Sequence, residues 1–170
     1  MKRSEFTKAQ MAGTRTATRN DVTTILPLLK ELHRESILCS VPIDEKKLHS
    51  FVLRSVKGRD RTCLIYQSAS SAIEGILIGY TSEYFFSKEK AARDLVFYVR
   101  PERRGSLVAY RLWAAFKAWA RAEGASSIWL GSAAGINPSR TRKFYRGLGM
   151  DEVGGIFRLS FERMSKPTLS

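Results

Sequence analysis

The stretch from residue 93 to residue 132 constrains the fold of this chain more than any other part of the sequence. RDLVFYVR, residues 93–100, is rich in β-forming residues and stops at Pro101. After Gly105 the apolar residues follow a helical period, and SSIWLGS at 126–132 is again typical of a strand. A strand, a helix and a strand in immediate succession predict two parallel strands joined by a right-handed crossover.

The other segments extend this unit into a mixed α/β sheet with helices. Strands are predicted at 14–18, 61–69, 73–86 and 151–163, and helices after Asn20 or Asp21, after Asp44, and at 138–149. The Ser/Ala turn between the second and third strands indicates a hairpin. Pro27 predicts that the first helix starts late or bends, and Gly154 with Gly155 predicts a bend or bulge in the last strand. We expect one domain over residues 14–170, preceded by a flexible polar tail at 1–13.

Composition narrows the class of protein. A chain of 170 residues with 44% hydrophobic residues can bury a core. Its two cysteines, Cys39 and Cys63, stand in no metal-binding or redox motif, which favours a reducing, cytoplasmic setting without a metal. No apolar run is long enough to span a bilayer, and the polar start MKRSEFTKAQ lacks the apolar segment of a signal peptide, so no membrane partner is expected.

The net charge of +13 favours anionic partners, which include nucleotides, phosphates, nucleic acid and acidic proteins. The basic turn RPERRGS, residues 100–106, lies where a strand passes into a helix. The first amides of a helix lack partners within it and lie at its positive end, so Arg103 and Arg104 beside them predict a diphosphate site, with Gly105 allowing close approach. The alternative is an ordinary turn with solvent-exposed arginines.

Two motifs resemble the GNAT superfamily of acyl-CoA-dependent N-acetyltransferases. VRPERRGSLVAYRL is similar to the family's V-x-P strand end followed by [Q/R]-x-x-G-x-[G/A], with Arg104 at the first position and Ala109 at the last. Leu107 stands where the family usually has its middle glycine. FYRGLGM is similar to the later F-Y-x-x-x-G-F segment, with Met150 in place of Phe. The element order agrees over about 14–162, and the motifs themselves cover roughly 99–110 and 137–150.

The resemblance implies a mixed, mostly antiparallel sheet flanked by helices, in which a splayed parallel strand pair forms the acyl-CoA cleft. It also implies direct transfer of an acetyl group from acetyl-CoA, as co-substrate, to a primary amine on a small molecule or a protein, with no metal. Main-chain groups of Phe97, Tyr98 and Val99 would contact the thioester carbonyl and the pantetheine. The pyrophosphate would lie on the turn formed by Arg103, Arg104, Gly105, Ser106, Leu107, Val108 and Ala109. A leucine at 107 keeps its backbone donor, although its side chain must point away from the ligand.

The same resemblance supplies the remaining site residues. Tyr145 occupies the family's tyrosine position and is predicted to protonate the leaving thiolate as general acid, with simple packing as the alternative. Glu83 or Asp94 could act as general base through water, although each could equally be an ordinary strand or turn carboxylate. Asn137 is expected to contact the pantetheine arm or to serve a turn. Arg142 belongs to a basic cluster with Arg140, Lys143 and Arg146, of which some members, Arg142 among the candidates, would reach the adenosine 3′-phosphate while most face water.

Further residues and partners remain open at this stage. His33 lies on the helix that borders the acceptor site in the family, or is a surface histidine. Homodimers are common in the family. A rival hypothesis is a basic module of the same fold that binds nucleic acid without catalysis, or that acetylates an amine carried by RNA. Against nucleic acid, the sequence shows no basic strand studded with aromatic residues of the kind that stacks exposed bases, and no recognised reading motif.

Overall fold

The structure is a computed structural model that describes residues 13–132 and 134–161. The described residues form two compact units, one of residues 13–32 and 43–131 and the other of residues 33–42, 132 and 134–161. Of the predicted tail, only Gly13 is among them, and its carbonyl accepts a hydrogen bond from the Gln67 amide at 2.7 Å. The single domain over 14–170 stays a prediction. None of the described helices combines the length and apolar character that crossing a membrane requires.

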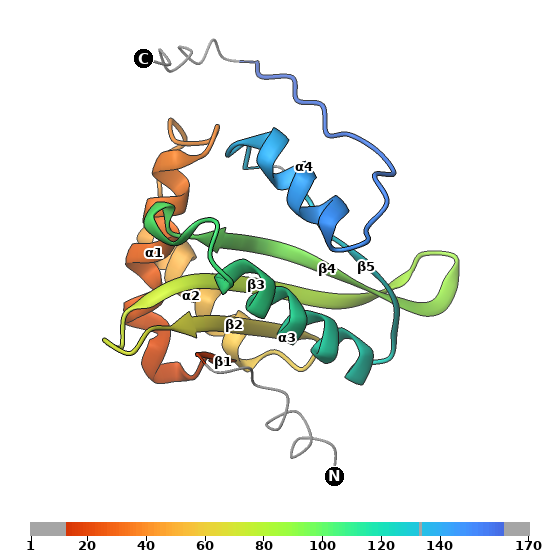
Figure 1. The fold of residues 1–170 in the computed structure, drawn as a ribbon, viewed down its shortest axis with the longest axis horizontal. Helices are drawn as coiled ribbons and strands as arrows, with labels where there is room; N and C mark the ends of the chain where they lie inside the picture. Colours follow the sequence, from red (N-terminus) through yellow and green to blue (C-terminus); the bar gives the residue numbers. More distant parts are fainter. Residues whose placement is uncertain (1–12, 133, 162–170) are drawn as a thin grey trace. The chain divides into compact units, whose positions relative to one another are not determined.

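The first unit contains a five-stranded sheet with the strands in sequence order (Figure 1). Its strands are β1 (Thr14–Thr16), β2 (Arg61–Gln67), β3 (Ile73–Tyr84), β4 (Ser87–Val99) and β5 (Ala125–Trp129). Strands β1 to β4 pair antiparallel, and β4 pairs parallel with β5. The predicted hairpin, the parallel pair and the mixed α/β class are therefore confirmed. Strand β4 begins six residues before the predicted start at 93, because pairing with β3 keeps its charged first residues in a strand.

The helices are α1 (Val22–Glu35), α2 (Glu45–Lys57), α3 (Val108–Ala122) and, in the second unit, α4 (Pro138–Gly147). Short 3₁₀ turns, η2 (Arg19–Asp21) and η3 (Pro101–Arg103), precede α1 and α3. The predicted caps of two helices are confirmed, since the Asp44 carboxylate accepts from the Lys47 amide at 3.0 Å and Pro138 opens α4.

Helix α1 begins at Val22, directly after Asp21, one of the two residues predicted to precede it. Thr18 caps the short turn η2 before α1, and the Asp21 carboxylate accepts from the Thr18 amide at 2.7 Å and from its hydroxyl at 2.8 Å. The helix runs through Pro27 without a late start. Pro27 lies on the exposed side of α1. Water can therefore solvate the carbonyl that the missing proline N–H leaves without a donor.

Helix α3 packs on one face of the sheet, and α2 lies behind the opposite face (Figure 1). Two glycines of β3 allow α3 to come close. A Cβ at Gly75 would meet the side chains of Leu112 and Val108 at 2.9 Å, and a Cβ at Gly79 would collide with the ring of Phe116. Both faces of β3 are buried, which is why its sequence shows little alternation.

The strand predicted at 151–163 is absent over its described part, residues 151–161. Its large apolar side chains are exposed, from 68% for Ile156 to 96% for Phe157 and Phe161. A strand is stable only when its backbone is paired, and the alternating apolar pattern that suggested one supplies no partner. Residues 162 and 163 lie outside the described residues.

The contact between Gly79 and Phe116 makes a stability prediction. Gly79→Ala should destabilise the fold by about 1–3 kcal/mol, because the added methyl group overpacks the interface between β3 and α3. Gly147→Ala is the matched control, because nothing lies within 4 Å of a Cβ at this helical position. It should be neutral or stabilise by up to about 1 kcal/mol. Urea unfolding measures both, and equal stability of the two variants would contradict the packing described here.

Candidate active site

Strands β4 and β5 separate part-way along their length. Strand β4 pairs with β3 from Ser87 to Val99, whereas its pairing with β5 ends at Arg93 and Trp129. Residues 94–99 of β4 consequently have β3 on one edge and no described strand on the other. This is the splayed parallel pair that the sequence predicts.

Asp94 occupies the point of divergence. Its carboxylate accepts a hydrogen bond from the Gly131 amide at 2.9 Å, just beyond the end of β5. The register between β3 and β4 shifts here, from Ile78 opposite Val96 to Gly79 opposite Asp94. Burial raises the pKa of Asp94 from its ordinary value of 3.8 to about 6, although backbone hydrogen bonds, that of Gly131 foremost, oppose the shift. A carboxyl group that titrates near neutral pH can accept and release a proton under working conditions.

Phe97, Tyr98 and Val99 connect this point to the turn. They lie opposite Leu77, Ile76 and Gly75 in the β3 ladder. Tyr98 and Val99 are buried. Pairing with β3 therefore fixes the backbone of residues 97–99, beyond the point where β5 leaves β4.

The turn after β4 is closed by its own hydrogen bonds. The Ser106 hydroxyl donates to the Arg103 carbonyl at 2.6 Å and accepts from the Val108 amide at 3.3 Å. Gly105 has φ +89°, a left-handed conformation that glycine adopts without strain. The glycine predicted to allow close approach is thus needed for the turn itself.

Backbone donors gather at the start of α3. Within the described residues, the amides of Gly105, Leu107, Ala109 and Tyr110 have no hydrogen-bond acceptor, and the first intrahelical bond runs from the Arg111 amide to the Leu107 carbonyl. The Leu107 side chain is 63% exposed. Donors of this kind at the positive end of a helix suit an anion.

The two arginines of the turn contact the protein. The Arg103 Nε atom lies 2.8 Å from the Glu74 carboxylate, which neutralises its charge. Arg104 Nε donates to the Val99 carbonyl at 2.9 Å, and its guanidinium lies over the Tyr98 ring, 5.4 Å from the centroid. Arg104 is therefore held against the end of β4, whereas Arg103 links the turn to β3 through its ion pair with Glu74.

The second unit carries the remaining predicted residues. Tyr145 lies on α4, half-buried, with its ring centroid 5.8 Å from that of Phe144. Asn137 has φ +42° and caps α4 by accepting from the Arg140 amide at 3.2 Å. Arg142 lies 3.4 Å from Glu152. Asn137 and Arg142 thus have local structural partners in addition to any role toward a ligand.

Two other candidates lie apart from the divergence or are engaged locally. Glu83 is exposed and lies opposite Lys90 in the β3–β4 ladder. It is four residues along β3 from Gly79, the partner of Asp94, so the two carboxylates' positions are about 13 Å apart along the strand. The His33 ring lies 2.8 Å from the Val41 carbonyl. Asp94, rather than Glu83, is therefore the carboxylate at the end of the β4–β5 pairing.

Sequence reasoning did not identify Gly131 or Tyr110. Both contribute through the backbone amide, which any residue other than proline carries, so residue type gives no signal. Their positions could have been inferred only from the end of the strand pairing and from the first turn of the helix.

Comparison with known proteins agrees with this geometry. A sequence model of the acetyltransferase (GNAT) family matches residues 29–150. The chain belongs to the GNAT acetyltransferase family. It is therefore an acyltransferase by family, and the resemblance of its two motifs to GNAT proteins is confirmed. A comparison with curated proteins found no match.

Solved GNAT structures share the fold at low sequence identity. An acetyltransferase from Trypanosoma brucei is 18% identical, with 87% of this chain and 98% of that chain covered and a TM-score of 0.68. AAC(6′)-Iy, in complex with a CoA-linked bisubstrate analogue, is 15% identical, with 90% and 97% covered and a TM-score of 0.70. A ribosomal-protein-alanine N-acetyltransferase from Brucella melitensis is 17% identical, with 87% and 99% covered and a TM-score of 0.65.

The raised pKa of Asp94 predicts a pH effect on stability. Between about pH 4 and pH 6 the folded state holds a proton that the unfolded state has lost, so the contribution of this group falls as pH rises through that window. Asp94→Asn keeps an acceptor for Gly131 and removes the titration. Its advantage over wild type should grow by up to about 3 kcal/mol from pH 4 to pH 6.5 and stay constant above pH 7. Urea unfolding at a series of pH values measures it, and a constant difference would refute the burial argument.

Proposed function

We propose that this GNAT domain transfers the acetyl group of acetyl-CoA directly to a primary amine. The observation that carries the proposal is the row of backbone amides at the start of α3, which follows directly on the splayed end of β4. A ligand whose anionic group is held by those amides can extend along β4 over the residues that follow the end of its pairing with β5.

The residues of the turn fit a diphosphate. The amides of Gly105, Leu107 and Ala109 supply donors, the helix supplies its positive end, and the Arg104 guanidinium lies beside the turn, where its Nε atom donates to the Val99 carbonyl. The exposed Leu107 side chain leaves its own amide available. The family's middle glycine is therefore dispensable for binding in this chain.

Direct transfer needs few side chains. Bound acetyl-CoA supplies a thioester. The amine nitrogen forms a bond to the acetyl carbon, the carbon–sulfur bond breaks, and the amine proton must leave while the thiolate gains one. Asp94 accepts the amine proton, directly or through water, and Tyr145 donates to the thiolate sulfur. A main-chain amide of residues 97–99 stabilises the oxyanion that develops on the carbonyl oxygen.

The similarity to AAC(6′)-Iy supports this proposal, because that structure holds a ligand in which CoA is joined to an acetylated amine-bearing molecule.

The anion site predicts that two substitutions of nearly the same size differ in their effect on coenzyme A affinity. Leu107→Asp places a carboxylate among the amide donors and should weaken coenzyme A binding at least about tenfold by repulsion and by competition for the donors. Leu107→Asn caps the helix equally well without the charge, and both should keep or raise the thermal stability. Isothermal titration with coenzyme A measures the difference. Equal affinities for the two variants would place the diphosphate elsewhere.

The acid assignment predicts a split between turnover and binding. Tyr145→Phe should lower kcat roughly 10²–10⁴-fold while leaving coenzyme A affinity within about twofold, because only the transferable proton is lost. Tyr66→Phe is the control. Tyr66 lies on strand β2, and its hydroxyl accepts a hydrogen bond from Arg111 at 3.1 Å. Removing this hydroxyl should leave kcat unchanged. Unchanged turnover in Tyr145→Phe would remove the acid role.

A further inference from the structure

A row of alternating cationic and aromatic side chains crosses the sheet. The strand register places Arg61 opposite Tyr80, Tyr80 opposite Arg93, and Arg93 opposite Trp129. Residues opposite each other in neighbouring strands project from the same face. These four residues, which we call the cross-strand row, come from β2, β3, β4 and β5 and are half-buried or exposed.

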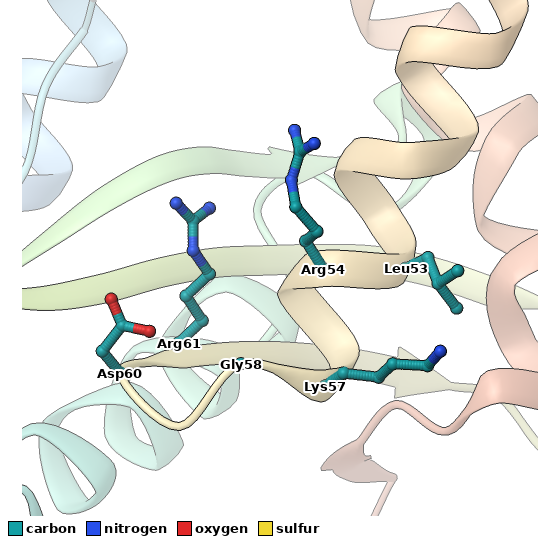
Figure 2. A pocket seen from close by; sticks show the side chains of 6 residues that line it. All are labelled: Leu53, Arg54, Lys57, Gly58, Asp60 and Arg61. Atoms are coloured by element: carbon teal, nitrogen blue, oxygen red, sulfur yellow. The ribbon is translucent and has the colours of Figure 1, made fainter.

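The cross-strand row lies on the face opposite α3. Gly79 faces the Phe116 ring of α3, and successive residues of a strand point to opposite faces, so Tyr80 points toward the α2 side. At that side Arg61 and two residues of α2, Arg54 and Lys57, line a pocket of about 380 Å³. Figure 2 shows the Arg54 and Arg61 side chains extending in the same direction.

The cations of this face differ in their partners from several other arginines of the unit. Among the described residues no carboxylate forms an ion pair with Arg54, Lys57, Arg61 or Arg93, although Asp60 lines the same pocket. Elsewhere in the same unit, the ion pairs of Arg15 with Asp21, Arg100 with Glu31 and Arg103 with Glu74 show the opposite pattern. The unpaired charges therefore point to an anionic ligand.

Trp129, an aromatic member of the row, is held in position by its indole N–H. Trp129 Nε1 donates to Tyr84 Oη at 3.3 Å and to Ser127 Oγ at 3.2 Å, and the ring is 42% exposed. Arg93 lies over that ring, 5.5 Å from its centroid. Phe86, which is 72% exposed, stacks on Tyr84 and extends the aromatic surface. Fixed, accessible rings beside cations suit planar groups that carry phosphates.

The row ends at the proposed acyl site. Arg93 and Trp129 are the last pair before β4 and β5 separate, and Asp94 follows directly. A ligand lying along the row from Arg61 therefore presents its end to the point of divergence.

We propose that the cross-strand row binds single-stranded nucleic acid and that the acceptor amine is carried at the end of that strand. Bases stack on the Tyr80 and Trp129 rings while phosphates meet Arg54, Arg61 and Arg93. Arg54 lines the same pocket as Arg61, and Arg61 and Arg93 lie about 10 Å apart at two strand spacings. The acceptor role rests on the proposed function. The nucleic-acid amine gains the acetyl group and loses a proton, and coenzyme A leaves as the thiol.

This arrangement answers the objection raised by the sequence. No single strand mixes basic and aromatic residues in the required way, but the register assembles the mixture from four strands. The net charge of +13 also favours binding of a nucleic-acid strand, which is a polyanion.

Fluorescence anisotropy with a labelled 12-nucleotide single-stranded RNA of mixed sequence tests the binding. Wild type should bind, and the double variant Arg54→Ala/Arg61→Ala should bind at least about tenfold more weakly, with a salt slope smaller by about 1.4 for two lost phosphate contacts. The control, Lys117→Ala/Arg121→Ala, removes the same charge from exposed positions of α3 and should stay within about twofold of wild type. Equal loss in both double variants would overturn the proposal, because it would show attraction to net charge alone.

A second variant tests the rings. Trp129→Leu keeps an apolar side chain and should weaken RNA binding about fivefold or more by removing one stacking surface, with circular dichroism confirming the fold. Single-stranded DNA should bind comparably, because stacking and phosphate contacts do not require a 2′-hydroxyl. A duplex of the same sequence that binds as tightly as the single strand would overturn base stacking.

Coenzyme A titration separates this inference from the proposed function. Arg54→Ala/Arg61→Ala should bind coenzyme A as wild type does, because both residues lie outside the turn. Wild type that binds coenzyme A but no single strand overturns the inference and leaves the proposed function intact. Wild type that binds the single strand but no coenzyme A overturns the proposed function and the acceptor role with it.

Discussion

The incomplete pairing between β4 and β5 is the constraint on which the rest of the site depends. Strand β4 is held along its whole length by β3, and β3 in turn is held by α3 packing against Gly75 and Gly79. Because this side is fixed, β5 can leave β4 after Arg93 without loosening the sheet. The hydrogen bond from Gly131 to Asp94 secures the point of divergence. The end of β4, which β5 no longer accompanies, and a helix start rich in donors then follow one another along the chain.

Most of the fold could be predicted from the sequence, because local patterns decide it. The helical period after Gly105 and the strands on either side gave the parallel crossover, and Asp44 and Pro138 marked helix starts. The predictions that were wrong depended on the surroundings of a segment and not on its own residue pattern. Pro27 fits inside α1 because its side faces solvent. Residues 151–161 form no strand, because an alternating pattern indicates which side chains a strand would bury and not which strand would pair with it.

The sequence predicted where the site residues lie along the chain more readily than which groups they contact. Arg103 and Arg104 stand in the expected turn, but their partners, Glu74 and the Val99 carbonyl, are distant or main-chain groups that no motif reveals. The cross-strand row is the clearest case, because it exists only once the register of four strands is known. Asp94 was one of two carboxylate candidates, and its place at the divergence, invisible in a local pattern, separates it from Glu83.

Titration of the ¹⁵N-labelled protein with coenzyme A, followed by amide NMR, tests the central claim most directly. The account predicts that the amides of Gly105, Leu107, Ala109 and Tyr110 show the largest shifts, because these donors gain a phosphate acceptor. Amides of residues 94–99 should follow with smaller shifts as the pantetheine lies along β4. Saturable shifts confined to other regions, with the turn after residue 100 unaffected, would contradict the account.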